Sequence, residues 1–309
     1  MSQTNIGHTK YSENFLKIRA LSWNDIYKVC SQLESQWVFR GHSETNWTLS
    51  SSLERLFFRC GTPYHLISTF EQEMIRQFQR SAHLYLSNLP SNENVTEWLA
   101  LMQHYGAPTR LLDFTHSFYF ASYFACEEVT EDAAVWCLNL KRIFNNIGLF
   151  DQIVSNEIKF ETTYPYHIMP DYLKNRKTPG LVVIEPEIQN ERLHLQQGLF
   201  LCPRDFAISF MEELSYMTNI SRDEFIDVNS DSIAVFDHQL PNLEDYDVLK
   251  IEIDKMVQKQ VLNELKKMNV SSATLFPGLD GFSRSLKIYA IPSLDVFNYL
   301  AEKNFPWKK

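Results

Sequence analysis

The sequence from Gln103 to Thr115 reads QHYGAPTRLLDFT and contains the clearest change of secondary structure in the chain. Residues 98–105 before it follow a helical pattern that stops at Gly106, with Pro108 beyond, which is the usual order at a helix exit. Residues 111–114 then predict a short strand. Helix and strand therefore alternate at this point, and the same alternation continues in both directions along the chain.

On the N-terminal side, Ser22 with Asp25 three residues later resembles a capping box and predicts a helix start. Apolar residues at every fourth position predict a long amphipathic helix over residues 66–82. Strands are expected at residues 37–39, 47–49, 133–140, 181–184, 199–201 and 248–253, and further helices at 118–127 and after Asp254. Residues 145–180 read as irregular. The interleaved elements predict an α+β fold with a small mixed or antiparallel β core and surrounding helices.

The chain shows no internal repeat and no Gly/Ser linker. We therefore expect one domain over residues 21–290, preceded by an N-terminal extension at 1–20 and followed by a C-terminal tail at 291–309. With 309 residues and 44% hydrophobic residues, the chain is long enough to bury a core without disulfides or metals.

The net charge of −9 argues against a broad basic surface for nucleic acid. The five cysteines form no CxxC pair, so neither a zinc site nor a disulfide framework is expected, and no metal is predicted. The N-terminus is polar, and the longest nearly apolar run, Phe118–Cys126, is far below the roughly 20 residues of a membrane span. We expect a cytoplasmic protein without a membrane partner.

Arg40, Gly41 and His42 form the first candidate site, at the end of the strand predicted at 37–39. A guanidinium presents a planar fork that suits phosphate, carboxylate or a ribose diol. Glycine at position 41 would let a ligand or backbone approach closely. The structural alternative is a buried Arg40 in an ion pair with an acidic neighbour.

The stretch 103–115 itself is the second candidate site. His104 could serve as a general acid or base, or as a donor to phosphate. On a strand Arg110 and Asp113 point to opposite faces, whereas Asp113 and Thr115 share one face. The structural alternative is a set of polar side chains that only cap local backbone, which is costly unless each is satisfied.

Two later stretches are weaker candidates. Gln197 beside Gly198 offers an amide at a predicted turn before a strand, although an ordinary hairpin turn explains it equally well. Residues 274–281, TLFPGLDG, read as a tight turn in which Asp280 accepts from local backbone, a structural role. The motifs of P-loop, Rossmann, zincin and α/β-hydrolase enzymes are missing.

The order of these stretches resembles the bacterial FRG domain, a family named for the tripeptide found here at residues 39–41. The resemblance covers roughly residues 20 to 285. It is carried by Phe39-Arg40-Gly41, Gln103-His104-Tyr105-Gly106, Pro108 to Asp113, Tyr123-Phe124-Ala125, Gln197 to Phe200, Leu275-Phe276-Pro277 and Leu279-Asp280-Gly281. The family name does not fix a reaction, but its members look like proteins of bacteria and phages in toxin or phage-defence settings.

A second resemblance is to ADP-ribosyltransferases of the Arg-Ser-Glu type. These place an Arg on a first core strand, then a Ser/Thr-rich strand end, a helix ending in Phe-Ala and another strand, and finally a strand with a Gln-x-Glu or Glu-x-Glu turn. In this chain Arg40-Gly41, the segment Asp113 to Thr115 and the turn Gln196-Gln197-Gly198 look like the three elements. No Glu occupies the last position, so the resemblance requires another carboxylate, with Asp113, Glu71 and Glu73 as candidates.

The resemblance implies NAD as a co-substrate and a dissociative reaction. Arg40 and His42 would grip the ribose-phosphate part of NAD, and Tyr105 and Tyr123 would sandwich nicotinamide. A carboxylate would stabilise the positive charge left on the ribose, and an RNA or protein acceptor would attack. The expected site residues are Arg40, His104, Arg110, Asp113 and Gln197 for catalysis, and Gly41, His42, Tyr105 and Thr115 for binding NAD.

Three functions remain open from the sequence. The leading one is an NAD-consuming ADP-ribosyltransferase toxin or phage-defence effector, with a neutralising antitoxin as a further partner. The second is a non-catalytic module that recognises a nucleotide or nucleic acid through Arg40, His104 and Arg110. The third is a metal-independent hydrolase or nuclease that uses His104 and Asp113 as acid and base.

Overall fold

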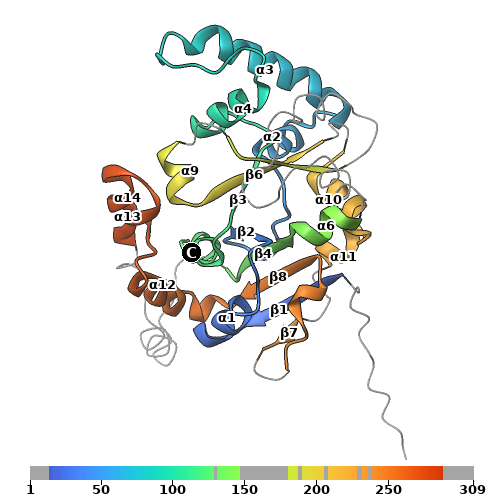
Figure 1. The fold of residues 1–309 in the computed structure, drawn as a ribbon, viewed down its shortest axis with the longest axis vertical. Coiled ribbons are helices and arrows are strands. Elements are labelled where there is room, and N and C mark those ends of the chain that lie inside the picture. The colour runs from blue at the N-terminus through green and yellow to red at the C-terminus, as the bar shows by residue number, and fades with distance from the viewer. Residues whose placement is uncertain are drawn as a thin grey trace, which may run out of the picture.

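The computed structural model describes residues 14–128, 131–146, 180–186, 190–204, 208–227, 232–235 and 239–287. These residues form a mixed sheet of eight strands with helices packed around it (Figure 1), as the α+β prediction requires. The strand order is β5-β6-β3-β2-β4-β8-β1-β7. The strands are β1 (Phe15–Ala20), β2 (Trp37–His42), β3 (Leu112–Thr115), β4 (Ala133–Asn139), β5 (Leu181–Ile184), β6 (Gly198–Pro203), β7 (Ile233–Ala234) and β8 (Val248–Ile253).

The helices begin where the sequence supplies a side-chain cap. Ser22 accepts a hydrogen bond from the Asp25 amide (3.2 Å) and starts α1, and Ser51 with Glu54 forms a full capping box on α2. The helices are α1 (Trp23–Cys30), α2 (Ser52–Cys60), α3 (Ile67–Ala82), α4 (Val95–His104), α5 (Phe118–Cys126), α6 (Leu140–Asn146), α9 (Glu191–Leu195), α10 (Phe210–Thr218), α11 (Arg222–Ile226), α12 (Gln258–Lys267), α13 (Ser272–Leu275) and α14 (Gly278–Ser285).

Strand β1 pairs in parallel with β7 on one side and β8 on the other, whereas the remaining neighbours in the sheet are antiparallel. The expected boundary at residue 21 is therefore wrong, because it leaves β1 in an extension outside the domain. The sequence did not indicate β1, because residues on both faces of this strand are buried. Apolar and polar residues therefore do not alternate along it as they do in a half-buried strand.

One face of the four strands β1, β8, β4 and β2 is apolar along its length. In-register partners on this face form rows, since residues opposite one another in a sheet point to the same side. The first row is Leu16, Leu249, Cys137 and Phe39, and the second is Ile18, Ile251, Val135 and Gly41. Helices α1, α5 and α12 cover this face with one continuous core (Figure 1).

The opposite face of the same strands changes character along its length. Its first row is apolar and consists of Phe15, Val248, Leu138 and Val38, which pack in a second core with α6, α10 and α11. Its second row is Lys17, Lys250, Trp136 and Arg40, and its third begins with Arg19 and Glu252 and ends with His42. We call these two rows the charged rows.

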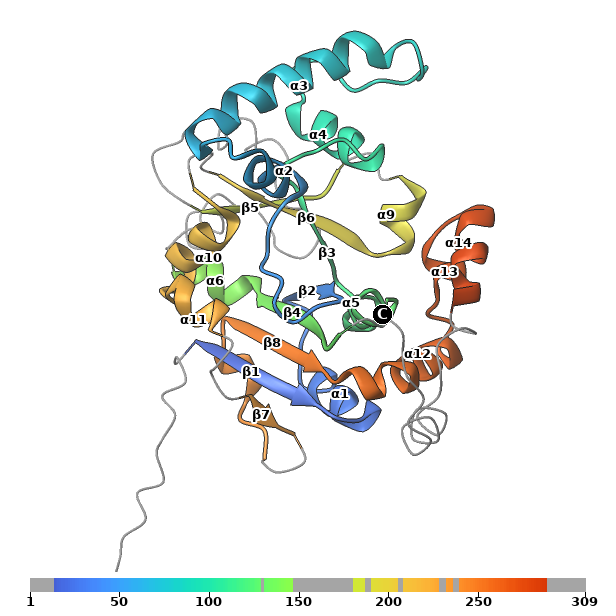
Figure 2. The same cartoon turned by 180° about the vertical axis from the view of Figure 1, so that it is seen from behind.

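The other half of the sheet, β3, β6 and β5, lies under α3 and α4. Figure 2 shows these two helices at the end of the molecule opposite β1 and β7. Apolar residues of α3 and α4 pack against Phe200 and Cys202 of β6 and against Val182 and Ile184 of β5 in a third core.

The predicted strands at 37–39, 133–140, 181–184, 199–201 and 248–253 are present, with ends that differ by a few residues, as is the long helix α3. The strand expected at 47–49 is wrong, because these residues form a loop. That loop packs against the charged rows, since the ring of Trp47 contacts the ring of His42 with centroids 6.0 Å apart. Residues 147–179 of the segment read as irregular, and the expected tail at 291–309, lie outside the described residues.

Candidate active site

Arg40 lies near the end of β2 and is held on two of its three nitrogens. Its Nε donates to Nε2 of His42 (3.0 Å), and Nη1 donates to the carbonyl of Asp113 (2.7 Å) with the Asp113 carboxylate 3.8 Å away. Within the described chain, Nη2 donates no hydrogen bond, and the side chain keeps 18% of its exposure. The guanidinium is therefore fixed in place with one edge open to a ligand.

His42 positions this guanidinium. Because its Nε2 accepts from Arg40, the ring is neutral with its proton on Nδ1, which faces the carbonyl of Trp47 at 3.3 Å. Burial, followed by the charge of Arg40, lowers the pKa of His42 to about 3. Both ring nitrogens are thus in use, and the role expected from the sequence, a direct grip on NAD, is replaced by a hold on Arg40.

Asp113 lies on β3 beside Arg40 and belongs to a chain of hydrogen bonds. Its Oδ2 accepts from Nε2 of Gln103 (3.0 Å), and Gln103 Oε1 accepts from the hydroxyl of Thr109. Thr109 is tied to α2, because its amide donates to Ser52 Oγ (3.1 Å). The stretch 103–113 therefore orients one carboxylate, which is 56% exposed, toward one arginine.

Arg110 does not join this group. It forms a bidentate ion pair with Glu71 of α3, and the two residues are 7% and 0% exposed. A buried pair of this kind joins α3 to the start of β3. The structure thus places Arg110 outside the site and removes Glu71 from the list of replacement carboxylates. Glu73 lies on the exposed side of α3 with Arg76 and Gln77.

Gly41 serves packing rather than ligand approach. A Cβ at this position would lie 2.1 Å from the carbonyl oxygen of Ala121 and 2.6 Å from the amide nitrogen of Ala125. Both atoms belong to the backbone of α5, which crosses β2 at van der Waals distance. The expectation that Gly41 contacts NAD is therefore wrong, because the helix occupies that space.

His104 and Tyr105 lie at the exposed C-terminal end of α4, where their rings meet edge to face at 4.9 Å. Burial and then the charge of Arg192 lower the pKa of His104. Tyr105 lines a cavity with Phe78 of α3 and with Tyr85, which follows that helix. Tyr123, by contrast, is buried on α5 among residues of α12, α13 and α14. The two tyrosines have separate surroundings, so the predicted nicotinamide sandwich between them is wrong.

Thr115 fixes the turn that precedes β6. Its buried hydroxyl donates to the carbonyl of Gln196 (2.7 Å) and accepts from the amide of Ser117 (3.0 Å). The Gln197 carbonyl accepts from the amide of His116 (3.0 Å), and Gln197 has a positive φ of 47°. The Thr115 hydroxyl is therefore used to hold the backbone of this turn and is not available to a ligand. Gln197 is exposed just before β6, the strand next to β3.

Residues 274–281 are not a single turn. They form the end of α13 and the start of α14, and Asp280 is exposed on α14. Phe276 between them contacts the guanidinium groups of Arg192 (4.9 Å) and Arg284 (3.9 Å), and the Leu275 carbonyl accepts from Nε2 of Gln196 (3.0 Å). These contacts join the late stretch to the Gln196 turn. The single tight turn predicted at 274–281 is wrong, because the end of one helix and the start of another occupy these residues.

Two residues near the site escaped the sequence analysis. Arg55, exposed on α2, lies close enough for its charge to lower the pKa values of Arg40 and His42. Glu185, just after β5, faces His116 with Glu185 Oε1 3.6 Å from Nε2. No local pattern marks either residue, because both are brought in by strand pairing and by the packing of α2.

Part of the chain matches a known family. Residues 35–134 match the FRG domain model, a span that begins just before β2, includes the Arg40 and Asp113 pair, and ends in β4. No curated protein and no solved structure matches the chain. Residues 35–134 are therefore similar to the FRG domain, as the motifs in this part of the chain indicate, and the activity of the protein has to be argued from the site.

The described residues set two further bounds. They include no group of three or more His, Cys, Asp or Glu side chains that could hold a metal ion. Among them, no helix has the length and apolar character needed to cross a bilayer.

Proposed function

We propose that this FRG-domain protein is an ADP-ribosyltransferase that consumes NAD and modifies an RNA or protein acceptor in the cytoplasm, in a toxin or phage-defence setting. One observation carries the proposal. The three elements that resemble Arg-Ser-Glu transferases come from distant parts of the sequence, yet they lie on adjacent strands. Phe39 of β2 is in register with Thr115 of β3, which is in register with Gly198 of β6.

The residues around Arg40 suit one part of NAD. The open edge of the guanidinium can take a phosphate oxygen of the NAD diphosphate, and Arg55 adds a second positive charge nearby. Asp113 supplies the only carboxylate that the described chain places within 4 Å of Arg40. It takes the place of the missing Glu, because an exposed, oriented carboxylate can stabilise positive charge developing on the ribose.

The reaction would proceed by loss of nicotinamide. The bond between the ribose and the pyridinium nitrogen breaks with its electron pair, so nicotinamide leaves as a neutral molecule and positive charge remains on the ribose. The acceptor then forms the new bond with its lone pair and gives up a proton to solvent. Arg40 holds the phosphates, His42 and Gln103 hold Arg40 and Asp113, and Asp113 offsets the developing charge.

The test uses NAD labelled on its adenylate, with total RNA and a protein extract as separate acceptors. We expect label transfer with release of nicotinamide. The rate of transfer should fall at least about a hundredfold in Arg40→Lys and in Asp113→Asn. Arg142→Lys is the matched control, because Arg142 is a partly exposed arginine that pairs with Asp247 away from the site.

A further variant separates the two carboxylates. Glu185→Gln should retain label transfer if Asp113 stabilises the ribosyl cation. A large loss of label transfer in Glu185→Gln, with none in Asp113→Asn, would assign that role to Glu185 instead. NAD binding without nicotinamide release would favour a recognition module. The absence of both binding and label transfer would contradict the proposal.

A further inference from the structure

A polar cavity of about 170 Å³ lies over the charged rows, on the β1 and β8 side of the sheet. Its walls come from these two strands and β4, from the loop at 45–48 and from the chain at 225–227. Neither Arg40 nor Asp113 lines it, and the proposed transfer reaction makes no use of it. A function of this cavity therefore neither needs nor excludes the transferase proposal.

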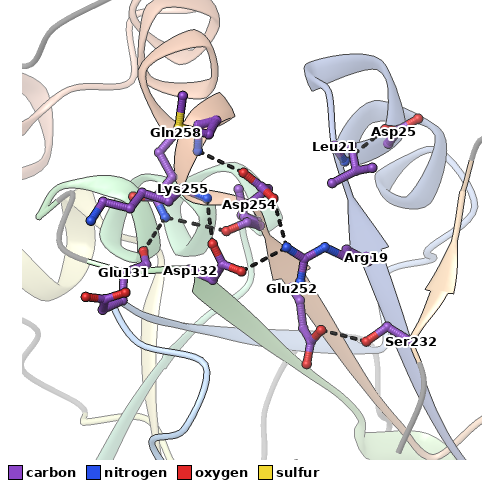
Figure 3. Close-up of polar contacts among 12 residues, drawn as sticks. Arg19, Leu21, Asp25, Glu131, Asp132, Ser232, Glu252, Asp254, Lys255 and Gln258 are labelled. Atoms are coloured by element: carbon purple, nitrogen blue, oxygen red, sulfur yellow. Dashed lines mark hydrogen bonds and ion pairs between the residues drawn. The ribbon is translucent and has the colours of Figure 1, made fainter. Parts of the chain in front are cut away.

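The cavity wall carries as many acidic as basic side chains. The basic ones are Lys17, Arg19 and Lys250, and the acidic ones are Asp132, Asp227 and Glu252. Figure 3 shows Arg19 between Asp132 and Asp254, at 2.9 and 2.8 Å. In the same view Glu252 accepts from the hydroxyl of Ser232 (2.6 Å). A balanced wall of this kind suits an uncharged ligand that offers hydrogen-bond donors and acceptors.

Lys250 is a lysine in an unusual setting within this wall. It is only 6% exposed, and its in-register partner on β1 is a second buried lysine, Lys17. Burial lowers the pKa of Lys250 to about 8; the charge of Glu252 acts against this shift and that of Lys17 adds to it. At pH 7 about one-tenth of the Lys250 amine is then uncharged, against less than about one-thousandth for an ordinary lysine. A desolvated lysine beside another cation is a setting in which the amine attacks carbonyl carbon.

The nitrogen of Lys250 is held at the cavity. Nζ donates to the carbonyl of Thr45 (2.6 Å) and lies 5.1 Å from the centre of the Trp136 ring, and both of these residues line the cavity. An uncharged amine has two N–H groups and a lone pair, so it can keep the bond to Thr45 and still attack. Glu252 lies two residues further along β8, on the same side of the sheet. Its carboxylate can offset the positive charge of a protonated imine.

The loop at 45–48 sets the size and polarity of the reactant. The cavity is smaller than a site that encloses a drug-sized ligand, so it fits a chain of a few carbon atoms. Asn46 and Thr48 add an amide and a hydroxyl to the charged groups of the wall. Trp47, which is 49% exposed, adds an aromatic ring that can contact C–H groups. A short aldehyde with hydroxyl groups matches these surroundings.

We propose that Lys250 forms a reversible imine with the carbonyl carbon of a short hydroxyaldehyde held in this cavity. The lone pair of the uncharged amine forms the new C–N bond, and the carbonyl oxygen leaves as water with the two amine protons. One further proton, taken from solvent, gives the imine a positive charge beside Glu252. Nothing is oxidised or reduced, and the addition of water reverses the step.

The test traps the imine on the unaltered protein, with glyceraldehyde and sodium cyanoborohydride at pH 7 and without NAD. The hydride reduces the imine to a stable secondary amine, which peptide mass spectrometry locates. Lys267, a lysine of α12 that is 69% exposed, is the internal reference. We expect Lys250 to be labelled at least about tenfold faster than Lys267, because more of its amine is uncharged. Labelling of Lys250 no faster than that of Lys267, or labelling of Lys17 in its place, would overturn the proposal.

A second aldehyde tests the class of the reactant. Propanal has the same number of carbon atoms as glyceraldehyde but no hydroxyl groups. With each rate divided by that at Lys267, glyceraldehyde should label Lys250 at least about fivefold faster than propanal, since its hydroxyl groups gain hydrogen bonds in the cavity. An equal ratio for the two aldehydes would show that the hydroxyl groups are not recognised and would overturn the assignment to hydroxyaldehydes.

Three variants place the reaction in the molecule. At limiting glyceraldehyde, the fast adduct in the intact mass spectrum should disappear in Lys250→Met and persist in Lys267→Met. Arg40→Lys should also keep it, because Arg40 does not line the cavity. A fast adduct that persists in Lys250→Met would overturn the proposal, and the peptide measurement on the unaltered protein decides the matter if this variant does not fold. Loss of NAD turnover with intact labelling of Lys250 would contradict only the transferase proposal.

Discussion

The two faces of β1, β8, β4 and β2 use the same four strands for different purposes. The face under α1, α5 and α12 is apolar in every row, with Ile18, Ile251 and Val135 fully buried. The other face starts with an apolar row and continues into the two charged rows, which hold Arg40 and the lysine pair. The first face therefore supplies core packing, and the second carries the charged residues of these strands.

The largest effect is expected on the apolar face. Ile251→Ala removes a fully buried side chain from the centre of the core and should lower the free energy of unfolding by about 4 kcal/mol. Denaturant unfolding followed by circular dichroism measures it. A loss below about 1 kcal/mol would show that this face is loosely packed and would weaken the contrast.

Gly41→Ala tests the same face at its tightest contact. The new methyl group would meet backbone atoms of α5, which cannot move aside as a side chain can. We therefore expect the free energy of unfolding to fall by about 3 kcal/mol. Thermal unfolding measures it, with Gly61→Ala as a comparison in which strain from a positive φ of 64° acts without crowding. A Gly41→Ala variant as stable as the parent protein would mean that α5 lies farther from β2 than described.

Lys250→Met tests the charged face, and its effect on stability should depend on pH. The pKa of Lys250 is about 8 in the folded protein, against 10.5 for an ordinary lysine. Between these values the unfolded chain binds more protons, so the parent gains stability as pH rises, by at most about 1.4 kcal/mol per unit. Below pH 8 the full cost of the buried charge is present, so Lys250→Met should be the more stable protein at pH 7.

The measurement compares the two unfolding free energies at pH 7 and pH 10. The advantage of the methionine variant should shrink at the higher pH. A constant difference would show that Lys250 titrates normally and is solvated, contrary to its burial.

The smallest effect on stability is expected for Arg40→Lys. Arg40 is partly exposed and its contacts to His42 and Asp113 are polar, so the free energy of unfolding should change by less than about 1 kcal/mol. The same variant should lose label transfer, as proposed above. Loss of folding together with activity would mean that Arg40 belongs to the structural part of the sheet.

Local signals in the sequence were enough for most elements. Serine caps, the four-residue spacing in α3 and the Gly106 exit are short-range features, and each predicted an element that the structure contains. Asp113 and His104 were expected near Arg40 because they belong to the two densest polar motifs, and the structure places Asp113 beside Arg40. The loop at 47–49 was mistaken for a strand since three bulky residues resemble one, although no partner strand is available there.

The side-chain roles depended on the tertiary structure. Arg110 and Asp113 are three residues apart, but α3 presents Glu71 to the first and β2 presents Arg40 to the second. Gly41 faces α5 and Arg40 lies on the opposite face of the sheet because adjacent residues of a strand point to opposite sides. Lys17 and Lys250 are 233 positions apart and meet only through the parallel pairing of β1 and β8. The sequence by itself determined which segments form helices and strands and which of them carry charge. Only the pairing of strands, a long-range event, decided which charges are buried together and which remain partly exposed.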